Sequence, residues 1–212
     1  REVHAVSFAS VTVTETFSDS NTNDHFISMP PVVNAGDILI ILFGQHATQD
    51  VTVPGGLTNI SDQNTVNGWR ADWKFADGTV GGTTVNYTTA FGGRFAAQVL
   101  RITGHGGAPA WVETSRTYPT QTLDPPSLTP TWGAADTLWI VTAQTRDDSY
   151  TLNAPPSGFS GGTMTKTNVA GTDAMVASAY RQENTATQDP GVWDFTTPGT
   201  RTWYLLTIGI RP

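Results

Sequence analysis

Residues 34–45 read NAGDILIILFGQ, in which five consecutive aliphatic residues follow directly after a Gly and an Asp. About a hundred residues later, residues 133–144 read GAADTLWIVTAQ and repeat the pattern. A strand buried on both faces is apolar at every position, and its polar start lies where a turn or water can satisfy the backbone. The two stretches therefore predict two strands, each in the centre of a sheet.

Gly36, Asp37 and Asp136 are the polar residues at these predicted strand starts. Glycine permits a bend that a side chain would resist, and an aspartate can accept hydrogen bonds from turn amides. A catalytic or metal-binding role would require a histidine or a second acid at a fixed spacing, and neither accompanies the two aspartates. We therefore predict a structural role for all three residues.

The rest of the chain is typical of an all-β protein. Apolar and polar residues alternate, Gly- and Pro-rich turns separate the segments, and no segment keeps helical spacing for three turns. The sequence predicts an antiparallel, jelly-roll-like β-sandwich. The expected strands are residues 5–16, 26–29, 37–44, 57–62, 69–75, 83–88, 94–102, 111–117, 136–145, 164–168, 174–181, 192–196 and 202–210.

The two halves of the chain match each other. Residues 28–41, SMPPVVNAGDILII, align with residues 127–140, SLTPTWGAADTLWI, at an offset of 99. Later matches are PGGL at 54 with PSGF at 156, VNYTT at 85 with WDFTT at 193, and RFAAQVLRI at 94 with TWYLLTIGI at 202. This period is longer than that of a solenoid repeat. The matches predict two related β repeats, residues 1–108 and 109–212, which form either one compact body or two tandem small sandwiches.

Composition narrows the class of partner. Charged residues make up 14% of the 212 residues, the net charge is -7, and Lys74 and Lys166 are the two lysines. Without a basic run we expect no nucleic-acid partner. Without a run of eighteen apolar residues or a charged-then-apolar leader we expect neither a membrane span nor a retained signal peptide. The absence of cysteine excludes disulfides and thiolate metal sites.

Two motifs and the histidines could carry chemistry. Residues 19–24, DSNTND, begin like a calcium loop, but Asp24 replaces the required Gly and Pro30 the bidentate acid. We expect a solvated turn there, and calcium binding stays open. Residues 158–162, GFSGG, fit a nucleophile elbow, yet they lie in a Pro/Gly loop and no histidine follows His105. The four histidines lack zinc spacing, and no pattern favours a glycosidase acid pair. We expect no catalytic site, metal or cofactor.

The aromatic residues alternate in several segments. In residues 67–75, NGWRADWKF, the period of two predicts a core face of Trp69, Ala71, Trp73 and Phe75, and a charged outer face of Arg70, Asp72 and Lys74. The same pattern predicts core positions for Val85, Tyr87, Trp193 and Phe195. Trp111 and Trp132 lie beside Gly/Pro loops and are the candidates for an exposed contact with another subunit or a glycan.

Several short motifs in order resemble a family of structural proteins of tailed bacteriophages. They are GDILI at 36, PGGL at 54, WKFA at 73, LRITG at 100, PSGF at 156, YRQ at 180 and the terminal IRP at 210, and they cover most of residues 28–212. The chain departs from the family where a Trp usually follows the turn Gly, because it has Leu57 and Phe159 there. The resemblance implies a non-enzymatic β-sandwich of the virion, either a capsid-surface decoration protein or a tail or fibre-associated protein.

The expected partners follow from this resemblance. They are capsid or tail subunits, together with further copies of the chain in a homo-oligomer such as a trimer. The alternative is a carbohydrate-binding or adhesin module that recognises a host glycan. An exposed coplanar aromatic pair beside an Asp or Asn would favour this alternative. Copy number and the choice between capsid and tail stay open.

Overall fold

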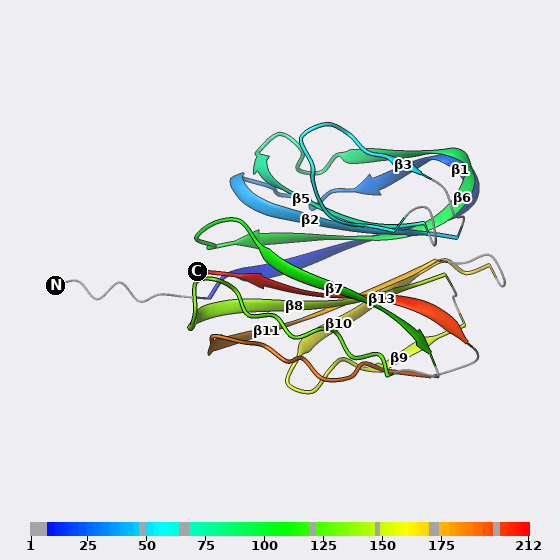
Figure 1. Cartoon of the computed structure of the whole chain (residues 1–212). Helices are drawn as coiled ribbons and strands as arrows, with labels where there is room; N and C mark the ends of the chain where they lie inside the picture. Colours follow the sequence, from blue (N-terminus) through cyan, green and yellow to red (C-terminus); the bar gives the residue numbers. More distant parts are fainter. Residues whose placement is uncertain are drawn as a thin grey trace.

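The protein is all-β, as the sequence predicts. The structure is a computed structural model that describes residues 8–46, 50–63, 68–118, 122–146, 149–169, 174–196 and 200–212, so the start of the first expected strand lies outside the described residues. Two antiparallel sheets pack face to face in a β-sandwich (Figure 1). In these ranges we find no helix with the length and hydropathy that a membrane crossing needs.

The first sheet is built from the first half of the chain. Its main strands lie in the order β1-β6-β2-β5-β4, and β3 pairs with one end of β6. The strands are β1 (Ser10–Ser28), β2 (Ala35–Gln45), β3 (Val51–Thr52), β4 (Thr58–Asp62), β5 (Trp69–Asp77) and β6 (Thr84–Thr103).

The second sheet is built from the second half, in the order β10-β11-β8-β13-β7, and a separate pair joins β12 to β9. The strands are β7 (Ala110–Tyr118), β8 (Ala135–Thr145), β9 (Thr151–Ala154), β10 (Ser160–Lys166), β11 (Met175–Thr185), β12 (Asp194–Thr196) and β13 (Arg201–Ile210). The two apolar stretches, residues 38–42 and 138–141, lie in β2 and β8, and each of these strands is the third of the five that form the main part of its sheet. The prediction of two central strands is confirmed.

The two sheets share one topology. β1, β6, β2, β5 and β4 occupy the same order in the first sheet as β7, β13, β8, β11 and β10 in the second. Even an irregularity is repeated: the register shifts by one residue between Asn59 and Ser61 where β4 pairs with β5, and between Ser160 and Thr163 where β10 pairs with β11. The sheets therefore behave as two copies of one unit, as the sequence match indicates.

The register of the copies corrects the sequence alignment by one residue. Leu39 lies opposite Lys74 and Arg101, and the residue in the same position of the second sheet is Trp139, opposite Arg181 and Gly209. The alignment at an offset of 99 pairs Leu39 with Leu138 instead. A one-residue shift moves a side chain to the other face of a sheet. The alignment is set by the matching aspartates, Asp37 and Asp136, which lie before the apolar runs. Inside the strands it is therefore wrong by one residue.

Three apolar cores hold the fold together. One lies between the sheets and joins residues of both halves, for example Ile40 and Ile140. The other two lie on the outer faces, one with Leu39 and Ile41 of the first sheet and one with Trp139 and Val141 of the second. Figure 1 shows how the outer faces are covered: β1 and β6 curl back over the first sheet, and β9 lies beneath the second. Both central strands are therefore buried on both faces.

This cover corrects the predicted faces of β5. Trp69 and Ala71 are buried as expected, but Phe75 at the end of the strand is 48% exposed. On the face predicted to be charged and solvated, Asp72 is completely buried, and Lys74 is half-buried. The prediction was wrong because the folded-back ends of β1 and β6 cover this face. The alternation of residues within β5 gives no sign of this cover.

The expected turn at DSNTND is also wrong. Residues 19–24 lie inside β1, which continues from Ser10 to Ser28 beside an equally long β6. Register shifts between Ser18 and Thr22 and between Thr22 and Asp24 interrupt the pairing. Such bulges bend a strand without ending it. The polar residues therefore mark the bend at which the two long strands fold back, and the FGG segment at 91–93 lies within β6 opposite this bend.

Candidate functional site: the β1 groove

A groove of about 400 Å³ follows the bend of β1. Its walls are Phe17, Ser18, Ser20, Thr22, Asp24 and Phe26 of β1 together with Phe95 of β6, and we call it the β1 groove. Phe17 is 49% and Phe26 is 56% exposed, whereas Phe95 is buried. The groove thus has a buried aromatic side chain at its base and two solvent-exposed rings along its sides.

The bulges of β1 place these side chains. Phe17 precedes the irregular stretch and Phe26 follows it, so the bend brings residues from its two sides into one groove. Polar contacts hold the bend: Asn23 Nδ2 donates to the carbonyl oxygen of Ala90 at 3.1 Å, and Asn86 Nδ2 donates to Asp24 Oδ1 at 2.7 Å. β1 is the edge strand of its sheet, where unpaired backbone groups are available to another chain.

An aromatic cluster supports the base of the groove. The ring of His25 packs against Phe95 at 5.1 Å and against Phe43 at 5.4 Å between centroids. Its Nε2 lies 3.0 Å from the hydroxyl of Thr89. His25 is completely buried, and this burial lowers its pKa from 6.5 to about 4 despite the nearby Asp24 carboxylate, which acts in the opposite direction. His25 is therefore neutral at physiological pH.

The buried histidine predicts a loss of stability in mild acid. The unfolded chain takes up a proton at His25 near pH 6.5, and the folded chain only near pH 4. The contribution of neutral His25 to the free energy of unfolding is thus fully present above pH 6.5 and falls as the pH drops toward 4. We expect His25 to account for a loss of about 3 kcal/mol over this range, measured by urea unfolding at several pH values.

The control is His25→Phe, which keeps a ring between Phe43 and Phe95 but cannot titrate. This variant should retain only the smaller slope due to other groups, including His46, whose pKa burial also lowers. A variant that loses stability in acid as steeply as the original chain would contradict the assignment.

Exposed apolar side chains are concentrated in the first half. Of the six strongly exposed large hydrophobic residues in the described ranges, five belong to residues 1–108: Phe17, Phe26, Val32, Phe75 and Phe91. The second half serves as an internal reference because it has the same topology. Through the strand registers, Phe17 corresponds to Ser115 and Phe75 to Gln182. The two halves thus differ at equivalent surface positions, apolar in one and polar in the other.

The predicted strand-start residues are all at the starts of the central strands. Gly36 has a φ of +88°, which favours glycine, and lies in a register shift between Ala35 and Ile38. Asp37 Oδ2 accepts hydrogen bonds from the backbone of Asn34 at 2.8 Å and from Arg101 Nε at 2.6 Å. Asp136 Oδ1 accepts one from Asn184 Nδ2 at 2.7 Å. The structure brings neither aspartate to the β1 groove.

These contacts predict unequal stability losses for the two aspartates. Asp37 is buried and pairs with a largely buried guanidinium, whereas Asp136 is half-buried and pairs with a neutral, exposed amide. We expect Asp37→Ala to cost about 2 to 3 kcal/mol and Asp136→Ala about 1 kcal/mol, because hydrogen bonds to charged groups contribute more and an unpaired buried charge is unfavourable. Chemical unfolding measures both, and equal losses would contradict the difference.

Trp111 and Trp132, the predicted contact residues, are both half-buried. Trp111 packs against the core between the sheets. Trp132 donates from its indole nitrogen to the hydroxyl of Thr137 at 3.3 Å, and its ring lies over Gly209, where a Cβ atom would approach within 3.4 Å. Trp111 lies in β7 and Trp132 in the turn before β8, and neither lines the β1 groove.

The acids of the DSNTND segment have protein partners. Asp19 Oδ1 accepts from the backbone of Asn168 at 2.8 Å, and Asp24 Oδ1 accepts from Asn86. Across the described ranges, no three His, Cys, Asp or Glu side chains gather into a group that could hold a metal ion. The Ser of GFSGG begins β10, so a strand and not a helix follows it.

Comparison of the chain with protein families, with curated proteins and with solved structures finds no match.

Sequence reasoning missed the exposed rings of the groove. Phe17 lies on the same side of the strand as Val11 and Val13, which pack against the core between the sheets, but the charged Glu15 interrupts the apolar alternation before it. Its exposure comes from its place on an edge strand next to the bend. The polar run at 19–24 could have indicated the bend, because it lies inside a long β-rich segment. Such a run is equally typical of a turn.

Proposed function

We propose that the chain is a non-enzymatic structural protein of a tailed-bacteriophage particle, located on the capsid surface or the tail. It acts by packing its first half against neighbouring virion subunits. The observation that carries the proposal is the pair of exposed rings, Phe17 and Phe26, in the β1 groove on an edge strand. Exposed aromatic residues beside a strand edge are a common basis for protein–protein contact.

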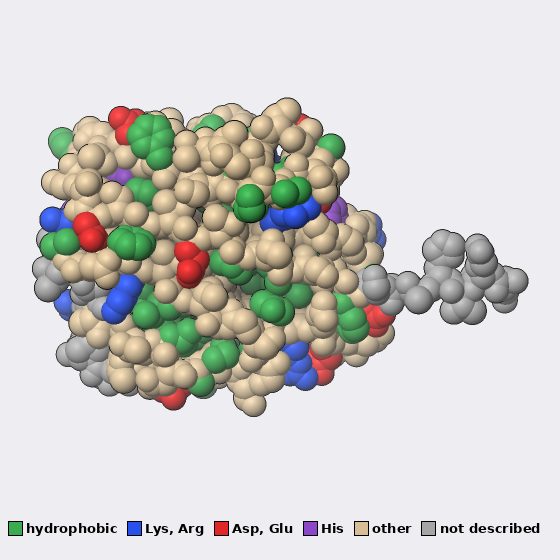
Figure 2. Space-filling view, turned by 180° about the vertical axis from the view of Figure 1, so that it is seen from behind, with side chains coloured by type: hydrophobic (Ala, Val, Ile, Leu, Met, Phe, Trp, Pro, Cys, Tyr) green, Lys and Arg blue, Asp and Glu red, His purple; other side chains and the backbone are tan. Residues whose placement is uncertain are grey.

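Two further features support this function. The order of GDILI, PGGL, LRITG and the terminal IRP is similar to that of phage structural proteins. The surface is also poor in charge: Figure 2 shows isolated charged side chains and small hydrophobic groups on a largely neutral face. Lysine is depleted at protein interfaces, and this chain has two. A neutral surface of this kind suits assembly in a crowded lattice.

A carbohydrate-binding module is the second candidate. It is favoured by one feature, the presence of Asp24 in the same groove as the two exposed rings. Aromatic rings beside a carboxylate are suited to bind sugars by stacking and hydrogen bonding. The two functions differ in the partner that the groove binds, so one set of variants tests both.

The test is sedimentation of the chain with phage particles that lack it. We expect saturable binding that persists at moderate salt, since apolar and neutral contacts are screened little. The double variant Phe17→Ser with Phe26→Ser should lose this binding. The matched control is Val192→Thr, which changes an exposed apolar residue of the second half and should bind normally.

Light scattering and a glycan array complete the test. Assembly into a homo-oligomer, or into a complex that buries on the order of 1,000 Å² or more, is expected for a structural subunit. A persistent monomer that binds a glycan through the β1 groove and has no affinity for particles would overturn the structural proposal and favour the carbohydrate-binding one.

A further inference from the structure

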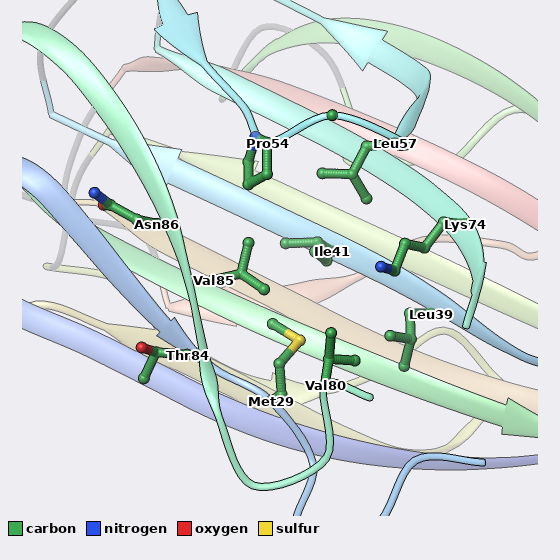
Figure 3. A pocket seen from close by; sticks show the side chains of 11 residues that line it. Met29, Leu39, Ile41, Pro54, Leu57, Lys74, Val80, Thr84, Val85 and Asn86 are labelled. Carbon is green, nitrogen blue, oxygen red and sulfur yellow. The ribbon is translucent and has the colours of Figure 1, made fainter. Parts of the chain in front are cut away.

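A cavity of about 320 Å³ lies on the outer face of the first sheet. Leu39 and Ile41 of β2 form its base, and the loop with Pro54 and Leu57 and the segment with Val85 cover it. In Figure 3 these apolar side chains project toward one common space. The cavity is separate from the β1 groove, because the two share no lining residue.

The second sheet shows what fills the same position in the other copy. At three places an aliphatic residue of the cavity corresponds to an aromatic residue of the second half. The pairs are Leu39 and Trp139, Leu57 and Phe159, and Val85 and Trp193. The strand register gives the first pair, the shared turn before β4 and β10 gives the second, and the match of VNYTT with WDFTT gives the third.

The aromatic members of these pairs are core residues. Trp139, Phe159 and Trp193 are buried at 0%, 7% and 2% exposure, and they belong to one continuous apolar cluster. In the first half, shorter side chains at the same places leave space open. Interiors of folded domains are normally packed without large voids. An open volume in one copy, where the other copy is filled by rings, indicates a site for a bound apolar group.

Lys74 gives this site a charge. It is the charged residue of the cavity lining, and Figure 3 shows its ammonium group directed toward the space between Leu39 and Ile41. Its counterpart Arg181 forms an ion pair with Glu183 at 2.6 Å, but the residue in the place of Glu183 is Ala76. Lys74 forms no hydrogen bond or ion pair with a described residue. Hydrogen bonds from Thr79 and, to a smaller extent, the charge of Lys74 lower the pKa of the nearby Asp77, so Lys74 and Asp77 interact electrostatically without forming an ion pair.

We propose that this cavity binds a small apolar monocarboxylate, with its apolar body on Leu39, Ile41, Leu57 and Val85 and its carboxylate on the ammonium group of Lys74. The ligand then supplies both components that the second half contains within its own chain, the aromatic filling and the acid. The cavity volume lies at the lower end of the range for small-molecule sites, which matches a ligand with a single ring.

Isothermal titration with 3-phenylpropionate and with 3-phenylpropanol tests the proposal. The two probes share the ring and the chain, and only the first carries a charge. We expect Lys74→Met to weaken binding of the acid about tenfold or more while leaving the alcohol unchanged, since a hydrogen bond to a charged group is lost. Lys166→Met, which removes the other lysine of the chain, is the charge-matched control and should bind the acid normally.

A second variant tests the cavity without its charge. Leu57→Phe combined with Val85→Trp introduces the residues of the second half, and should abolish binding of both probes while raising the melting temperature. The proposal is overturned if the original chain does not bind the acid, if the filled variant binds it with unchanged affinity, or if Lys74→Met weakens acid and alcohol equally.

Discussion

Asp72→Ala is expected to lower the free energy of unfolding by about 3 to 5 kcal/mol, because it leaves the buried hydroxyl of Tyr87 without its acceptor and removes the buried counter-charge of Arg70. Asp72 is completely buried. Its carboxylate accepts hydrogen bonds from Arg70 Nε at 2.7 Å, from the hydroxyl of Tyr87 at 3.0 Å and from Asn59 Nδ2 at 3.2 Å. Burial, reinforced by Asp72, holds the pKa of Tyr87 well above its usual value, so Tyr87 remains a donor.

Asp62→Ala is the matched control for this prediction. Asp62 pairs with the same guanidinium of Arg70, but its side chain is 42% exposed. An exposed ion pair contributes about 1 kcal/mol or less. Urea unfolding of the two variants should therefore separate them clearly. Similar small losses for both would show that Asp72 is hydrated in solution and that the fold-back of β1 and β6 does not seal this face.

Leu138→Ala is expected to cost about 2 to 5 kcal/mol, the usual range for truncation of a buried leucine. Leu138 is completely buried in the core between the sheets, where residues of both halves meet. Leu39→Ala should also fall in this range but nearer its lower end, because Leu39 already borders the 320 Å³ cavity and its neighbours lose fewer contacts. Denaturant unfolding measures both losses.

A loss well under 1 kcal/mol for Leu138→Ala would place that side chain outside a packed core and contradict the contact between the sheets. The same result for Leu39→Ala alone would leave that contact intact and would indicate only that the outer face is loosely covered.

The central strands could be predicted because their signal is local. An unbroken apolar run such as ILIIL in β2 is explained by burial on both faces wherever it occurs, and the repeat in β8 supports it independently. The burial of Asp72 could not be predicted in this way. It depends on β1 and β6 folding back over β5, and the bulges that allow this lie some fifty residues away in a segment that also reads as a turn.

The candidate sites depend on contacts that the sequence does not show. Phe17 is exposed because its strand lies at the edge of a sheet, next to the bend of β1. The sequence matches already pair Leu57 with Phe159 and Val85 with Trp193, but this difference in side-chain size becomes informative only with the cavity that Leu57 and Val85 line. The sequence match alone pairs Leu39 with Leu138 and conceals the difference in size at the equivalent position, Trp139.

The internal repeat offers a general means of separating structural from functional residues in this chain. Both halves carry the residues that the fold needs, such as the apolar central strands and the shared bulge beside β4 and β10. Differences at equivalent positions, such as Phe17 against Ser115, are not required by the topology. Several of them, including Phe17 and Leu57, line the β1 groove or the outer cavity, the two places where we propose binding.

The most direct test of the virion proposal is the amount of this chain in purified phage particles, measured by quantitative mass spectrometry against the major capsid protein. We expect a fixed copy number per particle that survives density-gradient purification at moderate salt, with hundreds of copies for a capsid decoration protein and a few for a tail protein. Recovery of the chain only in the soluble fraction, with none in the particles, would contradict it.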